Sequence, residues 1–395
     1  MAFAKIFNTP SLRITISQEV RAALQNSLLA WLAVKIIQSL TGLVVWQASF
    51  ARSQNNFYYY GLTPLTSGWQ GVLFGIWQRW DGIYYQMIAE RGYSQDKLSV
   101  FFPLYPLLGH WVSAFSGISV LISLLLIGNL MFIGSLFMLN LLAKDLFGQE
   151  VSRRVVLSVV IFPTAFFFSA IYPQSLALFL ILLSYYSVRK EHWALAGIAA
   201  FLAGLTHGTV FPLSLLLAIE VFQIFRQHNL FQRAILSFLP LMPLFGMALF
   251  MAWRIHFGYP SFQQVEISGW DDGFMTPWQF VHLLVSYTIA NSYNFINWIN
   301  IGMLILSCVV TVWSFRKLPF SVSIYQLSSL ILVVITEMNN KPLAAIGRYI
   351  LIMFPIFFFI GFQTQKKLIR VGVIELCVIM QILLTGFFFM WGFVG

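Results

Sequence analysis

The stretch ISVLISLLLIGNLMFIGSLFMLNLL, residues 118–142, decides the fold class of this chain because it contains no charged residue. A transmembrane helix needs about 20 apolar residues to cross a hydrocarbon core of roughly 30 Å, and this stretch is longer. The composition extends the argument to all 395 residues, of which 59% are hydrophobic and 9% charged, with a mean hydropathy of +0.80. Charged residues make up roughly a quarter of a typical soluble domain, so the soluble, disordered and small secreted classes of protein are excluded.

Apolar runs of comparable character recur along the chain. They predict an all-α polytopic membrane protein, a single multi-span domain over 1–395 with about eleven transmembrane helices. The runs lie at 28–50, 118–142, 155–171, 174–188, 193–206, 209–225, 234–253, 296–315, 320–336, 347–362 and 371–393. Two pairs are short, because polar breaks interrupt 155–188 near Tyr172 and 193–225 near His207.

Lys and Arg residues set the expected orientation. Most of the 23 basic residues fall in loops that share one side with the N-terminus, which predicts a cytoplasmic N-terminus. The outer side then carries the two longest non-spanning stretches, 51–117 and 254–295, both rich in Trp, Tyr and Pro. The short loops favour a bacterial plasma membrane over the endoplasmic reticulum. Function is therefore expected at the outer face.

The net charge of +10 does not indicate nucleic acid, because the basic residues form small groups between apolar runs and not one face. Cys308 and Cys377 both lie inside apolar runs, so they predict no disulfide framework. Membrane lipids are the partners that this composition predicts.

The first outer stretch contains a candidate catalytic residue. Residues 76–90 lack proline, which predicts a short interfacial helix. At 100° per residue Asp81 shares one face with Tyr84 and Tyr85, whereas Glu90 points the opposite way. A carboxylate among aromatic neighbours is partly desolvated and makes a better proton acceptor. The alternative is that Asp81 only hydrogen-bonds the local backbone.

The surrounding residues resemble a known family. RWDGIYYQMIAERGY at 79–93 and FFPLYPLL at 101–108 resemble the PIG-V type of mannosyltransferase, which adds the second mannose of glycosylphosphatidylinositol anchors, and its bacterial relatives. The resemblance extends to VVIFPTAFFFSAIYPQSLALFL at 159–180, WALAGIAAFLAGLTHGT at 193–209 and IGRYILIMFPIF at 346–357, so it touches most of the chain.

This family is similar to the GT-C class of glycosyltransferases, multi-span enzymes that take a sugar from a polyprenyl phosphate. The resemblance implies a GT-C-like fold and an inverting transfer of a hexose, with mannose the first expectation, to a lipid or glycan acceptor. Asp81 matches the catalytic acidic residue of the first outer loop, here as the general base. Where many relatives read Leu-Thr-Arg, this chain has Leu205, Thr206 and His207, and His207 would hold an anion electrostatically only when protonated.

Donor binding is expected where the two helix breaks and the family motifs meet. The short helices should leave a depression below the outer headgroups, with Lys341 as a further, weaker candidate cation. The expected donor-binding residues are Arg79, Trp80, Tyr84, Tyr85, Tyr105, Tyr172, Gln174, His207, Arg348 and Tyr349. Each has a plainer alternative: Arg348 as a snorkelling helix end, His207 as an interior histidine, and Tyr172 with Gln174 as a helix break.

The second outer stretch offers Trp270 and Trp278, whose rings could stack on an acceptor sugar. Asp271 and Asp272 could hold a divalent cation, but followed by Gly273 they read first as a turn. The sequence therefore predicts no metal or other cofactor. Two rival functions stay open: a transporter or flippase of a lipid or small solute, which predicts inverted repeats and midplane charges, and a non-catalytic assembly subunit.

Overall fold

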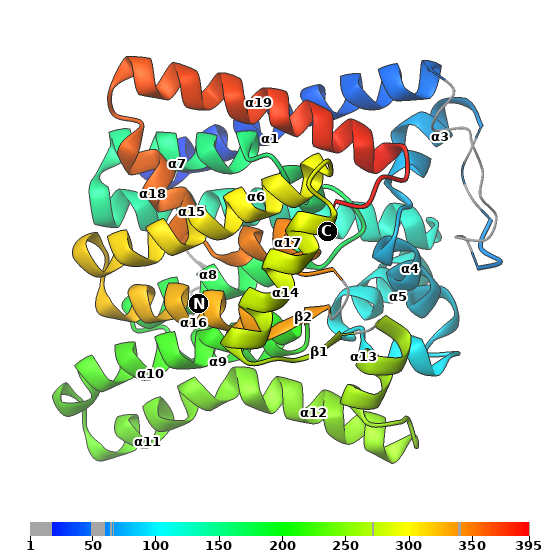
Figure 1. Cartoon of the computed structure of the whole chain (residues 1–395). Helices are drawn as coiled ribbons and strands as arrows, with labels where there is room; N and C mark the ends of the chain where they lie inside the picture. The colour runs from blue at the N-terminus through cyan, green and yellow to red at the C-terminus, as the bar shows by residue number, and fades with distance from the viewer. Residues whose placement is uncertain are drawn as a thin grey trace, which may run out of the picture.

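The computed structural model describes residues 18–48, 60–63, 65, 67–270, 272–338 and 341–394. Its long helices lie side by side along roughly one direction (Figure 1). Within the described residues, six helical segments are long and apolar enough to cross a membrane. A seventh is counted when Ile346–Ile352 and Pro355–Gln363, bent by 82°, form one span. The chain is a polytopic helical membrane protein, while eleven spans and the GT-C fold remain predictions.

The six long segments coincide with predicted apolar runs. They comprise α1 (Gln18–Gln47), α6 (Val120–Phe147), η5 (Gly208–Val210) with α10 (Pro212–Ile224) and η6 (Phe225–Gln227), α11 (Leu230–Phe238) with η7 (Leu239–Leu241) and α12 (Met242–His256), α15 (Phe295–Lys317), and α19 (Lys367–Phe389). Polar breaks are rare inside these segments, so each helix satisfies its own backbone groups in lipid.

The remaining apolar runs form shorter helices, as the interrupted sequence predicts. These are α7 (Gln149–Ile161), α8 (Gln174–Arg189), α9 (Trp193–Gly204), α16 (Phe320–Ile335), and the bent pair built from α17 (Ile346–Tyr349), η8 (Ile350–Ile352) and α18 (Pro355–Gln363). With 12 residues, α9 is about 18 Å long at 1.5 Å per residue, well short of a core of roughly 30 Å. The chain therefore turns within the depth that a full span would cross.

The described part of the first predicted outer stretch lies at one end of the bundle, whereas α14 (Pro277–Ala290) of the second lies in front of its middle (Figure 1). The first contains α3 (Gly68–Leu73), η2 (Gly75–Trp77), α4 (Asp81–Arg91), η3 (Asp96–Val100) and α5 (Leu104–Ser116). A separate short helix, η4 (Ala165–Phe168), lies between α7 and α8. The second contains α13 (Phe262–Trp270), β1 (Asp272–Phe274) and α14. Strand β1 pairs antiparallel with β2 (Thr336–Met338), placing Gly273 opposite Glu337. Asp272 and Gly273 are thus in a strand and not in the predicted turn, because β2 supplies a pairing edge that the local sequence does not reveal.

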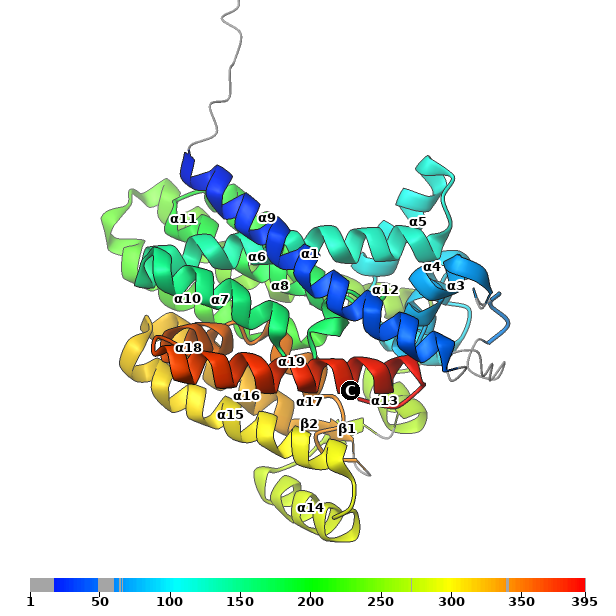
Figure 2. The same cartoon turned by 90° about the horizontal axis from the view of Figure 1, so that it is seen from above.

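Basic loop residues gather at the opposite end of the bundle. The α10–α11, α15–α16 and α18–α19 connections lie at the left of Figure 1, whereas α3, α4 and α5 lie at the right, and Figure 2 shows the same separation. Arg226, Lys317 and Lys366 belong to those connections. Nearby, Lys190 at the end of α8 pairs with Asp145 at 3.0 Å. The structure thus has a basic end opposite α4, and which end faces the cytoplasm remains a prediction.

The predicted interfacial helix over 76–90 is wrong in its first turn and in its environment. Trp80 adopts φ +53°, a conformation that few residues other than glycine take, and α4 begins only at Asp81. The side chains of α4 from Gly82 to Ala89 are buried, so α4 packs inside the protein. The interfacial pattern appears instead on α5, where Leu107, Trp111 and Phe115 form an exposed apolar stripe.

Candidate active site

Asp81 forms an ion pair with Arg348, a residue far away in the sequence. Asp81 is the first residue of α4, and its Oδ2 accepts a hydrogen bond from Nη1 of Arg348 in α17. Both side chains are mostly enclosed, with 16% of Asp81 and 17% of Arg348 exposed. The sequence analysis named both residues and did not predict their direct pairing. This ion pair brings the candidate base and a candidate phosphate-binding cation to one point.

Close packing at the start of α4 fixes the position of Asp81. A Cβ added to Gly82 would lie 2.9 Å from Cγ1 of Ile171, so only glycine lets α4 approach the 171–173 break this closely. The neighbouring Tyr172 is fully buried, and its hydroxyl donates a hydrogen bond to the Arg79 carbonyl oxygen at 3.4 Å. The helix break that follows α7 therefore supports the backbone that presents Asp81.

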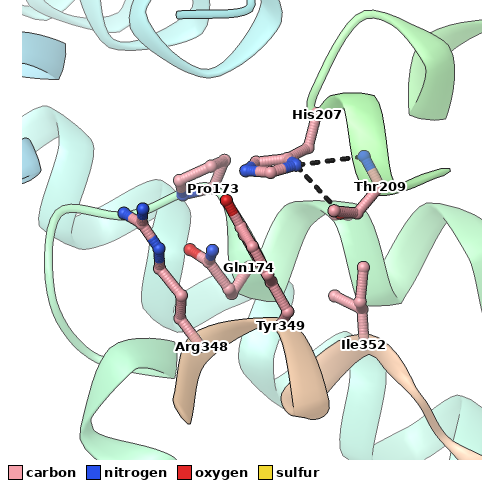
Figure 3. Close-up of a pocket in the computed structure, with 8 residues that line it drawn as sticks. Pro173, Gln174, His207, Thr209, Arg348, Tyr349 and Ile352 are labelled. Carbon is pink, nitrogen blue, oxygen red and sulfur yellow. Dashed lines mark hydrogen bonds between the residues drawn. The ribbon is translucent and has the colours of Figure 1, made fainter. Parts of the chain in front are cut away.

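A small hollow lies beside the ion pair (Figure 3). It has no room for a water molecule in this structure and is lined by Pro173, Gln174, Ala177, His207, Thr209, Arg348, Tyr349 and Ile352. These residues come from both predicted helix breaks and from α17 with η8. The structure therefore brings Gln174, His207, Arg348 and Tyr349 together, whereas Tyr172, which the short helix pairs also placed at this depression, does not line the hollow.

His207 is a neutral hydrogen-bond donor in this hollow. Its Nδ1 accepts from the Thr209 backbone N–H at 3.2 Å and contacts the Thr209 hydroxyl at 2.8 Å. Nδ1 is thus the acceptor, so the proton sits on Nε2, which points toward the Arg348 side of the hollow in Figure 3. Burial, reinforced by the positive charge of Arg348, lowers the pKa of His207 from 6.5 to about 3. His207 therefore offers a donor and no charge at neutral pH.

Two polar atoms at the hollow are buried without a hydrogen-bond partner among the described residues. They are Nε of Arg348, a donor, and Oε1 of Gln174, an acceptor. A buried polar atom left unpaired costs about 1–3 kcal/mol, so such atoms are uncommon unless a ligand or water completes them. Together with Nε2 of His207, they give the hollow unused hydrogen-bonding capacity.

Tyr85 and Tyr172 are fully enclosed tyrosines close enough to Asp81 to be affected by its charge. Their ring centroids are 6.4 Å apart, and Tyr85 also packs edge-on against Tyr105 at 5.6 Å. Burial raises the pKa of both the Tyr85 and Tyr172 hydroxyls, and the negative charge of Asp81 raises each further. Both phenols therefore stay protonated at neutral pH and can donate hydrogen bonds only as neutral groups.

Four predicted donor-binding residues have contacts that hold the fold together. Nε of Arg79 donates to the Phe389 carbonyl oxygen at 3.0 Å, and the residue is 1% exposed. Trp80 Nε1 donates to the Gly392 carbonyl oxygen at 3.2 Å, and Tyr105 donates to that of Leu124 at 3.0 Å. These contacts join α4 and α5 to the C-terminal segment and to α6. Tyr84 shares a 2.8 Å hydroxyl hydrogen bond with Tyr60.

The second outer stretch contributes no described side chain to the hollow. Trp278 begins α14 with 77% of its surface exposed. The Trp270 side chain and Asp271 lie outside the described residues, as does the side chain of Asp272. Lys341 is exposed, with its ammonium 5.9 Å from the Phe393 ring centroid. In the described part of the chain no group of three His, Cys, Asp or Glu residues could hold a metal ion.

The sequence analysis missed Thr209, which fixes the tautomer of His207 through two contacts. A signal was present, because a hydroxyl two residues after a polar side chain in a helix break commonly forms such local bonds.

Compared with known proteins, the chain matches no protein-family model and no curated protein. A function for this site must therefore be argued from its geometry and chemistry.

Proposed function

We propose that this protein is a membrane glycosyltransferase that moves a hexose, with mannose the first candidate, from a polyprenyl-phosphate donor to an acceptor hydroxyl. The observation that carries the proposal is the contact between Asp81 and Arg348 at the edge of a polar hollow. A transferase of this kind needs one base for the acceptor and one cation for the departing phosphate, and these two residues meet that need. The family resemblance of the motif around Asp81 supports the same assignment.

The hollow has the groups that a phosphate would require. Arg348 is a delocalised cation suited to phosphate oxygens, and Nε2–H of His207 is a neutral donor beside it. Helix α8 begins at Gln174, so its first N–H groups and the positive end of its dipole lie at the same wall. Phosphate binding thus does not require a protonated His207. A neutral histidine can therefore stand where many relatives of the resembled family have the Arg of Leu-Thr-Arg.

The transfer step requires one proton acceptor. The acceptor hydroxyl oxygen attacks the anomeric carbon from the face opposite the phosphate, and a new carbon–oxygen bond forms with inversion. The bond between the anomeric carbon and the phosphate oxygen breaks, so the polyprenyl monophosphate leaves with that electron pair. Asp81 takes the proton of the hydroxyl, and Arg348 stabilises the charge on the phosphate. A phosphate leaves without protonation, so no second carboxylate is needed, in contrast with glycoside hydrolysis.

The acceptor is expected to approach from the second outer stretch. Exposed Trp278 on α14 offers an aromatic face of the kind that packs against sugar rings, and Trp270 at the end of α13 is proposed for the same role. Membrane lipids surround the exposed apolar surface of the long helices. The site end of the bundle would face outward, with the basic end in the cytoplasm of a bacterial cell.

A direct assay tests this function. The purified protein in lipid nanodiscs is incubated with radiolabelled polyprenyl-phosphate mannose or glucose and a membrane extract as the acceptor source. We expect label to move from the donor lipid to a new product, and Asp81→Asn to abolish that movement. The same protein is also placed in sealed lipid vesicles, where unchanged label that crosses the membrane independently of Asp81 would favour the transporter function over transfer.

A further inference from the structure

The Nη1 donor of Arg348 is already taken by Asp81. In this structure its Nη1 binds Oδ2 of Asp81, and both side chains are largely enclosed. The proposed function requires Arg348 to face a phosphate and requires Asp81 to face an acceptor hydroxyl. One carboxylate oxygen cannot remain on the guanidinium while the phosphate occupies the same donor. In this structure, Oδ2 of Asp81 thus contacts Arg348, and a phosphate that used Nη1 would have to displace it.

The hollow is also closed in this state. It has no room for a water molecule, whereas ordinary small-molecule sites have roughly 300–1,000 Å³. Arg348 and Tyr349 from α17 form one wall, and the guanidinium carbon of Arg348 lies 5.3 Å from the Tyr349 ring centroid. Room for a sugar phosphate therefore requires movement of the lining, and the ion pair is a contact between this wall and α4.

We propose that the Asp81–Arg348 ion pair is a latch that an anionic phosphate opens, so that donor binding releases the base and precedes acceptor binding. The inference rests on the proposed function and adds an order of events to it. The ligand chemistry is a phosphate mono- or diester anion, whose source is either a lipid or free phosphate. Arg348 is a ligand-binding residue here. Its second role is to keep Asp81 from contacting the acceptor hydroxyl until the phosphate binds.

The exchange leaves Arg348 paired with an anion. When the phosphate replaces the carboxylate, Arg348 still faces an anion, so no isolated guanidinium is left in a low-dielectric site. Asp81 stays at the first residue of α4, where the positive end of the helix favours a carboxylate even without Arg348. The unpaired Nε of Arg348 gives the phosphate a further donor that Asp81 does not use.

Binding of a sugar-free probe separates the latch from catalysis. Polyprenyl monophosphate is titrated into the purified protein in nanodiscs of uncharged lipids, with inorganic phosphate as a second probe. Because Asp81 competes for Arg348, Asp81→Asn should bind the lipid probe about tenfold more tightly, equivalent to about 1.4 kcal/mol. Arg348→Gln should lose at least tenfold affinity. Glu90→Gln, which changes an exposed carboxylate bound to Gln86, is the matched control and should not change affinity.

The result also identifies the phosphate source. If Asp81→Asn gains affinity only for the lipid probe, the latch is opened by the donor lipid. An equal gain in affinity for inorganic phosphate supports a latch opened by any phosphate. Equal affinity of the wild type and Asp81→Asn for both probes overturns the latch while leaving the transferase function intact. Conversely, an absence of sugar transfer by the wild type would remove the proposed function without affecting the affinity comparison, and normal transfer by Asp81→Asn would remove only Asp81 as the base.

If Asp81→Asn fails to fold, hydrogen exchange of the wild-type protein tests the latch instead. Amides in the first turn of α4 are hydrogen-bonded, with Gly82 N–H donating to Arg79 at 3.1 Å and Ile83 N–H to Trp80 at 3.0 Å. Release of Asp81 loosens this turn, so saturating polyprenyl monophosphate should increase hydrogen exchange of peptides covering 81–84. Unchanged or slower exchange there, with the probe bound, would show that Asp81 stays on Arg348.

Discussion

Replacing Asp81 by Asn is the change that best tests the reasoning about this site. Asn keeps the shape and loses the basicity, and removal of a general base typically lowers the rate by about 10²–10⁴-fold. The same change deprives Arg348, which is 17% exposed, of its charged partner. A hydrogen bond to a charged group contributes about 1.5–3 kcal/mol. The lower figure applies, because the Asn carbonyl oxygen can still accept a hydrogen bond from Arg348, and it corresponds to a Tm loss of about 2 °C for a chain of 395 residues.

The assay is sugar transfer by purified variants, compared after each variant's Tm has been measured. Glu90→Gln is the control, because Glu90 lies on the same helix, is exposed and accepts a hydrogen bond from Gln86 at 2.7 Å. It should retain most activity and nearly all stability. The reasoning is refuted if Asp81→Asn keeps most of its transfer rate, or if Glu90→Gln is the more damaging change.

Three further predictions concern the phosphate site and the topology. Arg348→Ala should weaken donor binding by about 1.5–3 kcal/mol, and unchanged affinity in a donor titration would remove Arg348 from the site. Because the pKa of His207 is lowered to about 3 from an unfolded value near 6.5, stability is lost as pH falls below about 6.5. The free energy of unfolding of the wild type should fall by up to about 2 kcal/mol between pH 7 and 5. The Tm of His207→Gln should therefore fall less over this pH range than the Tm of the wild type. Equal decreases in Tm would contradict a buried neutral imidazole. A cysteine at exposed Trp278 should be labelled only from the outer face, whereas labelling from the cytoplasm would reverse the topology.

Helix lengths and breaks were predictable because they depend on local composition. The run at 118–142 became α6, and the breaks near Tyr172 and His207 appear where polar residues interrupt apolar runs. The error at 76–90 has a tertiary cause. Trp80 is held at positive φ with its indole on the Gly392 carbonyl oxygen, and no pattern within 76–90 reveals a partner so far along the chain.

Asp81 could be named from its motif, but its partner could not. The pairing with Arg348 spans 267 positions and depends on how α17 packs against α4, which periodicity within either helix does not encode. The same is true of the neutral state of His207, because burial and the charge of Arg348, not the residue type, lower its pKa. The sequence by itself therefore determined the membrane class, the candidate residues and the breaks that bring them inward, since these follow from local hydrophobicity. Only the tertiary structure decided which charges meet and which groups stay neutral, since electrostatic energies depend on distance and on exclusion of water.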